Sequence, residues 1–221
     1  MNLHNFVSNP YLIFLNLSRG NLTSIIYNNF SVQTISNLQV LDLSHNLLTF
    51  LNVSIFVNLP KLRVLDLSMN VISTILSPAS ITISQTLMEL NLLGLKLSTL
   101  NFNNLTSFQH LKNLDVSNGR FTSIGSLSTF RKLENLNLKS ELLENFPSDV
   151  FKGLNNLQRI KATNYKFCCD QILPKQMSKR NCVSKVNEIS SCENLLRSNV
   201  YRVFLWSIAF VAIGGKRMLF L

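Results

Sequence analysis

The sequence predicts an α/β solenoid, in which short parallel strands line a concave face and irregular or short helical segments form the convex side. Leu and Asn account for 40 and 28 of the 221 residues, and this joint enrichment is typical of a repeat protein. Hydrophobic residues make up 46% of the chain, enough for a continuous core and too many for a disordered protein. Anchor leucines recur every 22 to 26 residues, at Leu12, Leu38, Leu62, Leu87, Leu111, Leu133 and Leu157.

The individual repeats match the leucine-rich-repeat template L-x-x-L-x-L-x-x-N-x-L. Residues 38–48 read LQVLDLSHNLL, and residues 62–72 read LRVLDLSMNVI. Leucines at positions 1, 4 and 6 of each coil are expected to point into the solenoid. The asparagine at position 9, here Asn46 and Asn70, can bond backbone groups of neighbouring coils. Less regular coils are expected where it is replaced, by Gly20, Leu95, Gly119, Glu141 and Tyr165.

Residues 1–165 are predicted to contain about seven repeats, the first incomplete. No coil buries its apolar face alone, so the core depends on stacking. Residues 1–11 look like the back half of a repeat, and neither a Cys-rich cap nor a signal peptide precedes them, so we expect the chain to start within a longer natural protein. A second apolar residue stands six positions before several anchors and is expected to fill the convex side: Phe56, Leu105, Leu127 and Phe151.

Sequons and cysteines together indicate an extracellular domain. All four cysteines follow residue 167, which favours a local disulfide cluster over scattered reduced thiols. N-x-S/T sequons mark Asn21, Asn29, Asn52 and Asn104 as candidate glycosylation sites. A fifth sequon at Asn16 is less suitable, because Asn16 is predicted to lie at the centre of a concave strand.

Residues 166–199 are predicted to form a cysteine-containing hinge or C-terminal cap. Cys168 and Cys169 are adjacent, and Cys182 and Cys192 follow them. Disulfides from the adjacent pair to the two later cysteines are favoured over a zinc site, because neighbouring cysteines rarely share one tetrahedral ion. Such disulfides would close the open end of the solenoid.

Residues 200–221 contain an apolar segment, residues 203–213, in which Ser207 is the sole polar residue. A membrane helix needs about 20 apolar residues, so this segment is too short to span a bilayer. It is either an amphipathic or buried terminal helix or the start of a truncated first transmembrane helix.

The sequence CENLLRSNVYRVFLWSIAFVAIGG, after a leucine-rich array that ends in NYKFCC, resembles the junction between ectodomain and membrane in leucine-rich-repeat G-protein-coupled receptors. This family includes the glycoprotein-hormone and relaxin receptors. The resemblance implies disulfides between Cys168 and Cys182 and between Cys169 and Cys192. It also implies that Cys192, Glu193 and Asn194 form an activation hinge that contacts the transmembrane bundle.

The chain departs from the family pattern near its end. The family has Gly-Asn where this chain has Gly214-Gly215, and the remaining transmembrane helices are missing. We therefore expect a truncated receptor, which could couple to a G protein only through the missing transmembrane region.

The predicted concave face carries the candidate ligand-binding residues. Its central column is a stripe of acids and amides that ends in a base: Asn16, Asp42, Asp66, Asn91, Asp115, Asn137 and Lys161. The carboxylates favour a cationic peptide or a protein hormone as ligand. The alternative is that these are ordinary repeat residues on solvated strands. The candidate ligand-binding set is Asp42, His45, Arg63, Asp66, Glu89, Asp115 and Glu134.

Other classes of function find no support in the sequence. No motif of a hydrolase, metalloprotease or nucleotide-binding enzyme occurs, so we expect a non-enzyme with no cofactor and no metal. The net charge is +10, but no basic stripe with interleaved aromatics indicates nucleic acid. The predicted function is the extracellular ligand-binding region of a peptide or hormone receptor in the plasma membrane. The alternatives are a secreted or membrane-anchored adhesion or protein-interaction module, and a structural scaffold.

Overall fold

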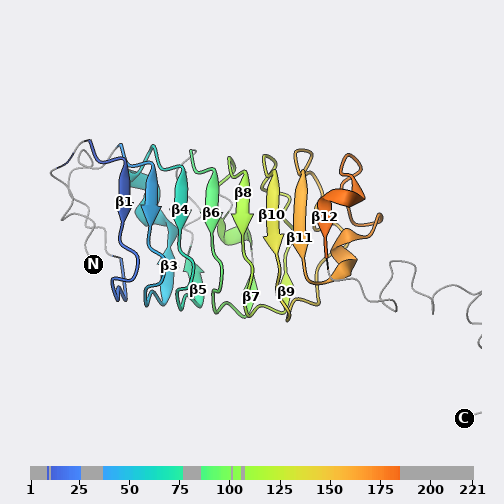
Figure 1. Cartoon of the computed structure of the whole chain (residues 1–221), viewed down its shortest axis with the longest axis horizontal. Coiled ribbons are helices and arrows are strands. Elements are labelled where there is room, and N and C mark those ends of the chain that lie inside the picture. The colour runs from blue at the N-terminus through green and yellow to red at the C-terminus, as the bar shows by residue number, and fades with distance from the viewer. Residues whose placement is uncertain are drawn as a thin grey trace, which may run out of the picture.

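The computed structural model describes residues 9, 11–25, 37–76, 86–100, 102–105 and 108–184, which form a solenoid of stacked coils (Figure 1). Each coil contributes one short strand to a parallel sheet along one side, and the strands follow one another along the stack. Among the described residues the sheet has eight strands: β1 (Phe14–Asn16), β2 (Val40–Asp42), β4 (Val64–Asp66), β6 (Glu89–Asn91), β8 (Asn113–Asp115), β10 (Asn135–Leu138), β11 (Arg159–Ala162) and β12 (Cys182–Val183).

The strands pair in one continuous register, which aligns equivalent repeat positions across the coils. Leu15 pairs with Leu41, Leu41 with Leu65, and Leu65 with Leu90, and each of these side chains is buried. Neighbouring residues on a strand point to opposite faces, so the residues on either side of each leucine lie on the outer, concave face. The register continues to β11, through the coils where the position-9 asparagine is replaced.

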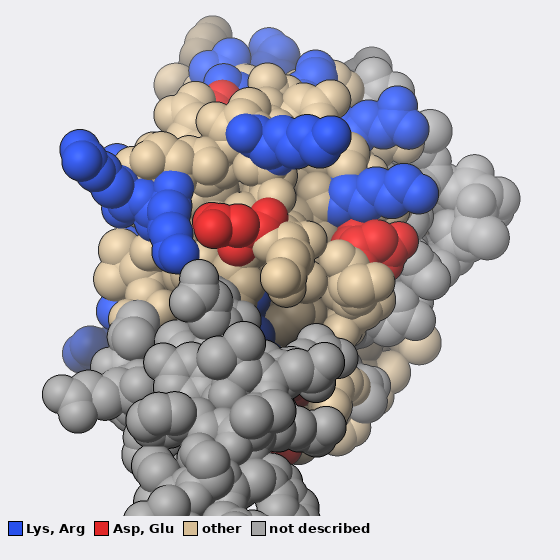
Figure 2. All heavy atoms as spheres, turned by 90° about the vertical axis from the view of Figure 1, so that its right-hand side faces the viewer, with Lys and Arg blue, Asp and Glu red and all other residues tan. Residues whose placement is uncertain are grey.

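The C-terminal cap is a continuation of the sheet. It contains the 3-10 helices η4 (Tyr165–Cys168) and η5 (Lys179–Asn181) and the last strand, β12. Strand β12 pairs with β11 in parallel, with Cys182 opposite Ile160. A disulfide joins Cys168 to Cys182. Figure 2 shows this end of the solenoid, where Lys and Arg side chains lie among separate, smaller acidic patches.

Short 3-10 helices and extended segments form the convex side. They are η2 (Val53–Asn58), η3 (Phe102–Leu105), and two small parallel sheets, β3 (Phe50–Asn52) with β5 (Thr74–Leu76) and β7 (Thr99–Leu100) with β9 (Ser123–Ile124).

The described residues confirm the predicted solenoid of parallel strands with short helical turns on the convex side, but they contain no α-helix, so this part of the chain is a parallel β-solenoid and not of the predicted α/β class. Each coil must return to the sheet within 22 to 26 residues, which leaves room for short helical segments of at most six residues here. Nucleating an α-helix is costly, and β-branched residues such as Val53 and Ile55 lower helix propensity. The turns close by i→i+3 bonds, as from Leu59 N–H to Phe56 O (3.0 Å). The predicted terminal helix at residues 200–221 lies outside the described residues.

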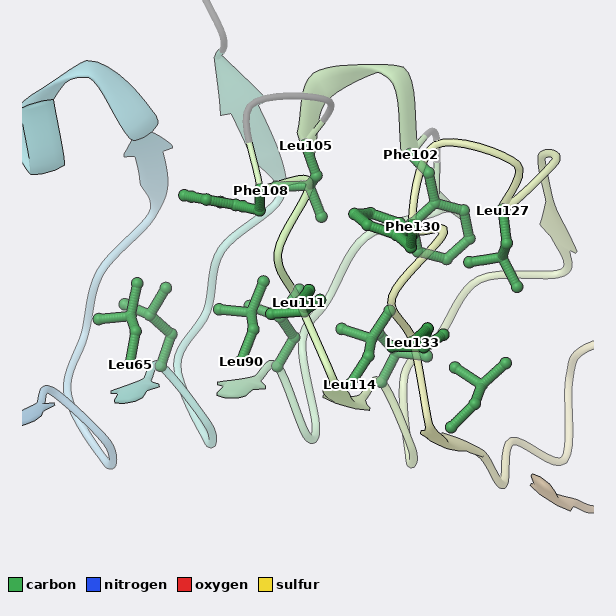
Figure 3. Close-up of a cluster of buried hydrophobic side chains, with 14 of the residues drawn as sticks. Leu65, Leu90, Phe102, Leu105, Phe108, Leu111, Leu114, Leu127, Phe130 and Leu133 are labelled. Atoms are coloured by element: carbon green, nitrogen blue, oxygen red, sulfur yellow. The ribbon is translucent and has the colours of Figure 1, made fainter. Parts of the chain in front are cut away.

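The core is one continuous apolar cluster between the sheet and the convex side (Figure 3). The anchor leucines from Leu38 onward are buried. The rings of Phe102 and Phe130 meet edge to face, with centroids 5.6 Å apart. The apolar residues predicted to fill the convex side are all buried, which confirms that prediction: Phe56, Leu105, Leu127 and Phe151.

The position-9 asparagines bridge adjacent coils, as predicted. Asn46 accepts hydrogen bonds at Oδ1 from the N–H groups of Gly20 (2.9 Å) and Leu22 (3.0 Å). Its Nδ2 donates to the carbonyls of Leu17 and Leu43, both at 2.9 Å. One side chain thus satisfies backbone groups of two coils, and the carbonyl of Leu43 accepts a second bond from Nδ2 of Asn70 (2.9 Å).

Gly119 replaces this asparagine in a later coil, and the ring of Phe121 fills the space instead. Phe121 is buried, and a Cβ built on Gly119 would overlap its ring. Gly119→Ala is therefore expected to lower the free energy of unfolding by about 1–3 kcal/mol through overpacking, as measured by urea denaturation. Gly125→Ala is the matched control, because a Cβ there meets no atom within 4 Å. Equal effects of the two substitutions would contradict this account of Gly119.

Candidate ligand-binding face

The candidate site is an open hollow on the concave face of the sheet. It has a volume of about 380 Å³ and is lined by side chains of β4, β6, β8, β10 and β11. Of the predicted ligand-binding residues, Asp66, Glu89 and Asp115 line this hollow. Asp42, His45, Arg63 and Glu134 lie outside its lining, elsewhere on the described face.

The central column forms as predicted. Its carboxylates, however, accept hydrogen bonds from the turns after their strands and from neighbouring strands. Oδ1 of Asp66 accepts the N–H of Ser68 (2.8 Å), and its Oδ2 accepts Nδ2 of Asn91 on the next strand (2.9 Å). Asp115 repeats the arrangement with Ser117 and Asn137, at 2.8 Å for both bonds. Each carboxylate therefore closes the turn after its own strand and also links its coil to the next one.

Asp42 also closes a turn, because its Oδ1 accepts the N–H of Ser44 (2.9 Å). The three aspartates are half-buried. The interpretation of the stripe as ordinary repeat residues thus accounts for these hydrogen bonds. The negative charges of Asp66 and Asp115 still face the hollow. Contacts with a ligand would require these carboxylates to share oxygens that already accept hydrogen bonds.

The outer candidates differ in their surroundings. Glu89 is exposed at the start of β6. Glu134 pairs with Lys112 at 2.8 Å, with side chains 31% and 43% exposed, so its charge is largely compensated by a neighbour. His45 lies in the turn after β2 with a positive φ of 53°. Glu89 is therefore the candidate carboxylate best placed to meet a ligand.

A second column of the concave face consists of the first residue of each strand. It changes from apolar to polar along the stack, a change that was not predicted from the sequence. The first residue of each strand is apolar in the N-terminal coils, where Phe14, Val40 and Val64 lie in register. From β6 onward the same position is polar or charged: Glu89, Asn113, Asn135 and Arg159. Phe14 is 56% exposed. The change from apolar to polar residues is visible in the sequence at position 3 of each repeat. Only the register between strands shows that these residues form one column.

The basic end of the face is formed by β11. Arg159 and Lys161 are exposed, and both line the hollow. Lys161 also pairs through its backbone with Val183 of β12. The hollow therefore runs from acidic residues on β4 and β6 to two bases beside the cap.

The candidate glycosylation sites have different environments. Asn21 is exposed, with a φ of 53°. Asn52 is half-buried, and its Oδ1 accepts the N–H and Oγ of Ser54 at the start of η2 (3.1 and 2.7 Å). Asn16 accepts the same pair of bonds from Ser18 (2.8 and 2.7 Å). Asn104 lies in η3, and Asn29 lies outside the described residues. Use of these sequons stays a prediction.

The predicted hinge is described in part. The Cys168–Cys182 disulfide is present, with Cα atoms 5.5 Å apart. Cys169 is also disulfide-bonded, and its bond to Cys192 stays a prediction. The activation hinge at Cys192, Glu193 and Asn194 lies outside the described residues. Within the described part of the chain, no helix has the length and apolar character that crossing a bilayer requires.

Comparison with known proteins supports the repeat assignment. The leucine rich repeat family matches residues 36–94. The G-protein coupled receptor GRL101 of Lymnaea stagnalis is 37% identical over 67 residues, which cover 30% of this chain and 6% of that protein. Relaxin receptor 2 of Canis lupus familiaris is 32% identical over 74 residues, covering 34% and 9%.

Chaoptin of Drosophila melanogaster is 26% identical over 170 residues, which cover 66% of this chain and 13% of Chaoptin. The chain thus spans 13% or less of the length of each of these relatives. Solenoids of this kind bind partners along an extended surface, and the disulfide is consistent with an extracellular compartment. Together, the register of the strands, the asparagine bridges and the family match establish that the chain contains leucine-rich repeats, folded as a parallel β-solenoid.

Proposed function

We propose that this chain is the extracellular ligand-binding region of a leucine-rich-repeat G-protein-coupled receptor for a peptide or protein hormone. The observation that carries the proposal is the open hollow on the concave face, with acids at one end and bases at the other. Two of the relatives are named as a G-protein coupled receptor and as a relaxin receptor. Coupling to a G protein would require the transmembrane helices of a longer chain.

The ligand that fits this face is a polypeptide that lies along the stack. Its apolar side chains would cover Phe14, Val40 and Val64, and a basic side chain would face Glu89. An acidic group would face Arg159 and Lys161, which are exposed on β11. Complementary charges of this kind set the orientation and speed of association.

Signal relay would begin at the basic end of the hollow. Lys161 is on the strand that pairs with β12, and β12 carries Cys182 of the disulfide. A ligand bound at β11 is therefore one strand away from the cap. In the full receptor, the cap would transmit the effect of ligand binding to the transmembrane region through the hinge predicted at residues 192–194.

The concave-face proposal is tested by reversing the charge of Glu89. Glu89→Lys is expected to weaken binding of a relaxin-family peptide by about ten-fold, or about 1.4 kcal/mol, as measured by surface plasmon resonance on the secreted 221-residue chain. Glu144→Lys is the matched control, because Glu144 is also exposed but lies outside the concave sheet. Equal affinities of the two variants, or no binding of any such peptide to the parent chain, would refute it.

An adhesion or protein-interaction module is the second candidate. The exposed apolar residues at the N-terminal end of the face favour it, because Tyr11, Ile13 and Phe14 are 85%, 53% and 56% exposed and suit a protein surface. Sequencing of full-length transcripts past the codon of Ile213 separates the candidates. Six further apolar segments would indicate a receptor, whereas a short basic tail or a stop codon would indicate an anchored or secreted module.

A further inference from the structure

The net positive charge of the described residues is concentrated at one end of the solenoid. Residues 155–184 contain six Lys or Arg and one acidic residue, Asp170. The described residues before position 155 contain ten Lys or Arg and eight Asp or Glu. Figure 2 shows Lys and Arg side chains on this end of the solenoid. The six cations are all exposed: Arg159, Lys161, Lys166, Lys175, Lys179 and Arg180. We call them the terminal basic surface.

The fold holds these cations together although they repel one another. The Cys168–Cys182 disulfide fixes η4, which carries Lys166, to the strand that follows Lys179 and Arg180. Pairing of β12 with β11 then places this group beside Lys161. Like charges held close together destabilise the folded chain unless something neutralises them.

Neutralisation within the described chain is weak. Lys179 lies 3.8 Å from Asp170, and the two side chains are 63% and 79% exposed, so the pair contributes little. In the middle of the sheet, by contrast, Lys112 is 2.8 Å from Glu134. The end of the solenoid therefore carries positive charge that is available to an external anion.

We propose that the terminal basic surface binds a sulfated glycosaminoglycan. A polymer with regularly spaced negative charges can contact several of these cations at once, and each contact releases counterions from the polymer. The inference rests on the extracellular placement in the proposed function, and the disulfide is consistent with that placement. Anionic phospholipids are concentrated in the cytoplasmic leaflet, so a sulfated polysaccharide is favoured over a lipid surface.

The test uses the 221-residue chain and heparin as the probe. A variant with Lys166→Gln, Lys179→Gln and Arg180→Gln is expected to bind immobilised heparin at least about ten-fold more weakly than the parent at 0.15 M salt. It should also elute from heparin at lower salt. The matched control carries Lys96→Gln, Arg120→Gln and Lys139→Gln, which removes the same charge from exposed residues of earlier coils. The control should keep the affinity of the parent.

Three outcomes would overturn the proposal. Equal loss of heparin affinity in the variant and the control would mean that binding depends only on the net charge of the chain. Equal retention of the parent on desulfated heparin would mean that sulfate groups are not recognised. Binding to phosphatidylserine vesicles without binding to heparin would mean that the surface meets lipid. Disulfide mapping of Cys168–Cys182 in each variant excludes misfolding as the cause. Failure of the glycosaminoglycan proposal would not affect the Glu89→Lys test of the proposed function, because two strands, β8 and β10, separate β6 from β11.

Discussion

Replacing Phe167 with Ala is expected to lower the free energy of unfolding by about 3–5 kcal/mol, the typical cost of emptying a buried phenylalanine site. Phe167 is fully buried at the junction between the last repeat and the cap. Its ring stacks on Phe146, with centroids 3.9 Å apart, and lies 5.9 Å from that of Phe151. The neighbouring Cys168 carries the disulfide, so a cavity here would weaken the packing of the whole cap on the repeats.

Urea denaturation followed by circular dichroism measures this effect. Phe50→Ala is the matched control, because Phe50 lies on β3 with 45% of its surface exposed, and its loss should cost well under half as much. Phe167→Leu should fall between the two, since it keeps part of the apolar volume. Similar losses for Phe167→Ala and Phe50→Ala would show that the cap does not depend on this aromatic cluster.

Asn70→Ala is expected to destabilise the chain by about 3 kcal/mol, because it removes the hydrogen bonds between two coils and leaves buried backbone groups without partners. Asn70 is 2% exposed. Its Oδ1 accepts the N–H of Leu48 (3.1 Å). Its Nδ2 donates to the carbonyls of Leu43 (2.9 Å), Leu67 (2.9 Å) and Ser68 (3.3 Å).

The same denaturation assay compares Asn70→Ala with Asn155→Ala, which replaces an exposed asparagine in a turn outside the sheet. Amide hydrogen exchange adds a local measurement. The N–H of Leu48 should lose protection in Asn70→Ala and keep it in Asn155→Ala. If Asn70→Ala leaves both stability and exchange unchanged, the asparagine bridge is not a main contributor to the stacking of the coils.

The repeat spacing was sufficient to predict where the strands lie, because leucines at positions 1, 4 and 6 have one way to be buried together. The positions of Leu41, Leu65 and Leu90 in the core follow directly from it. The bridging role of Asn46 was also predictable, since a small amide at a turn has few partners other than backbone groups. These features depend on each repeat and its nearest neighbour alone.

Three features could not be predicted from the pattern of single repeats. The convex turns contain too few residues to distinguish a 3-10 turn from a short α-helix. The hydrogen bond between Asp66 and Asn91 depends on the geometry of two coils 25 residues apart. Strand β12 forms through backbone pairing of Cys182 and Val183 with β11, and its sequence lacks the leucine template. Its place in the sheet is set by the disulfide and by the packing of Phe167.

The disulfide also determines how a mechanical load would enter the solenoid. The chain leaves the sheet after β12, so tension that enters through Val183 passes directly to Cys182. The covalent bond to Cys168 carries that tension past residues 169–181 to the backbone next to Phe167. The load therefore falls on the buried ring of Phe167 and the two phenylalanine rings packed against it. A cell-surface chain anchored on this side would resist traction at its base and yield first among the repeats.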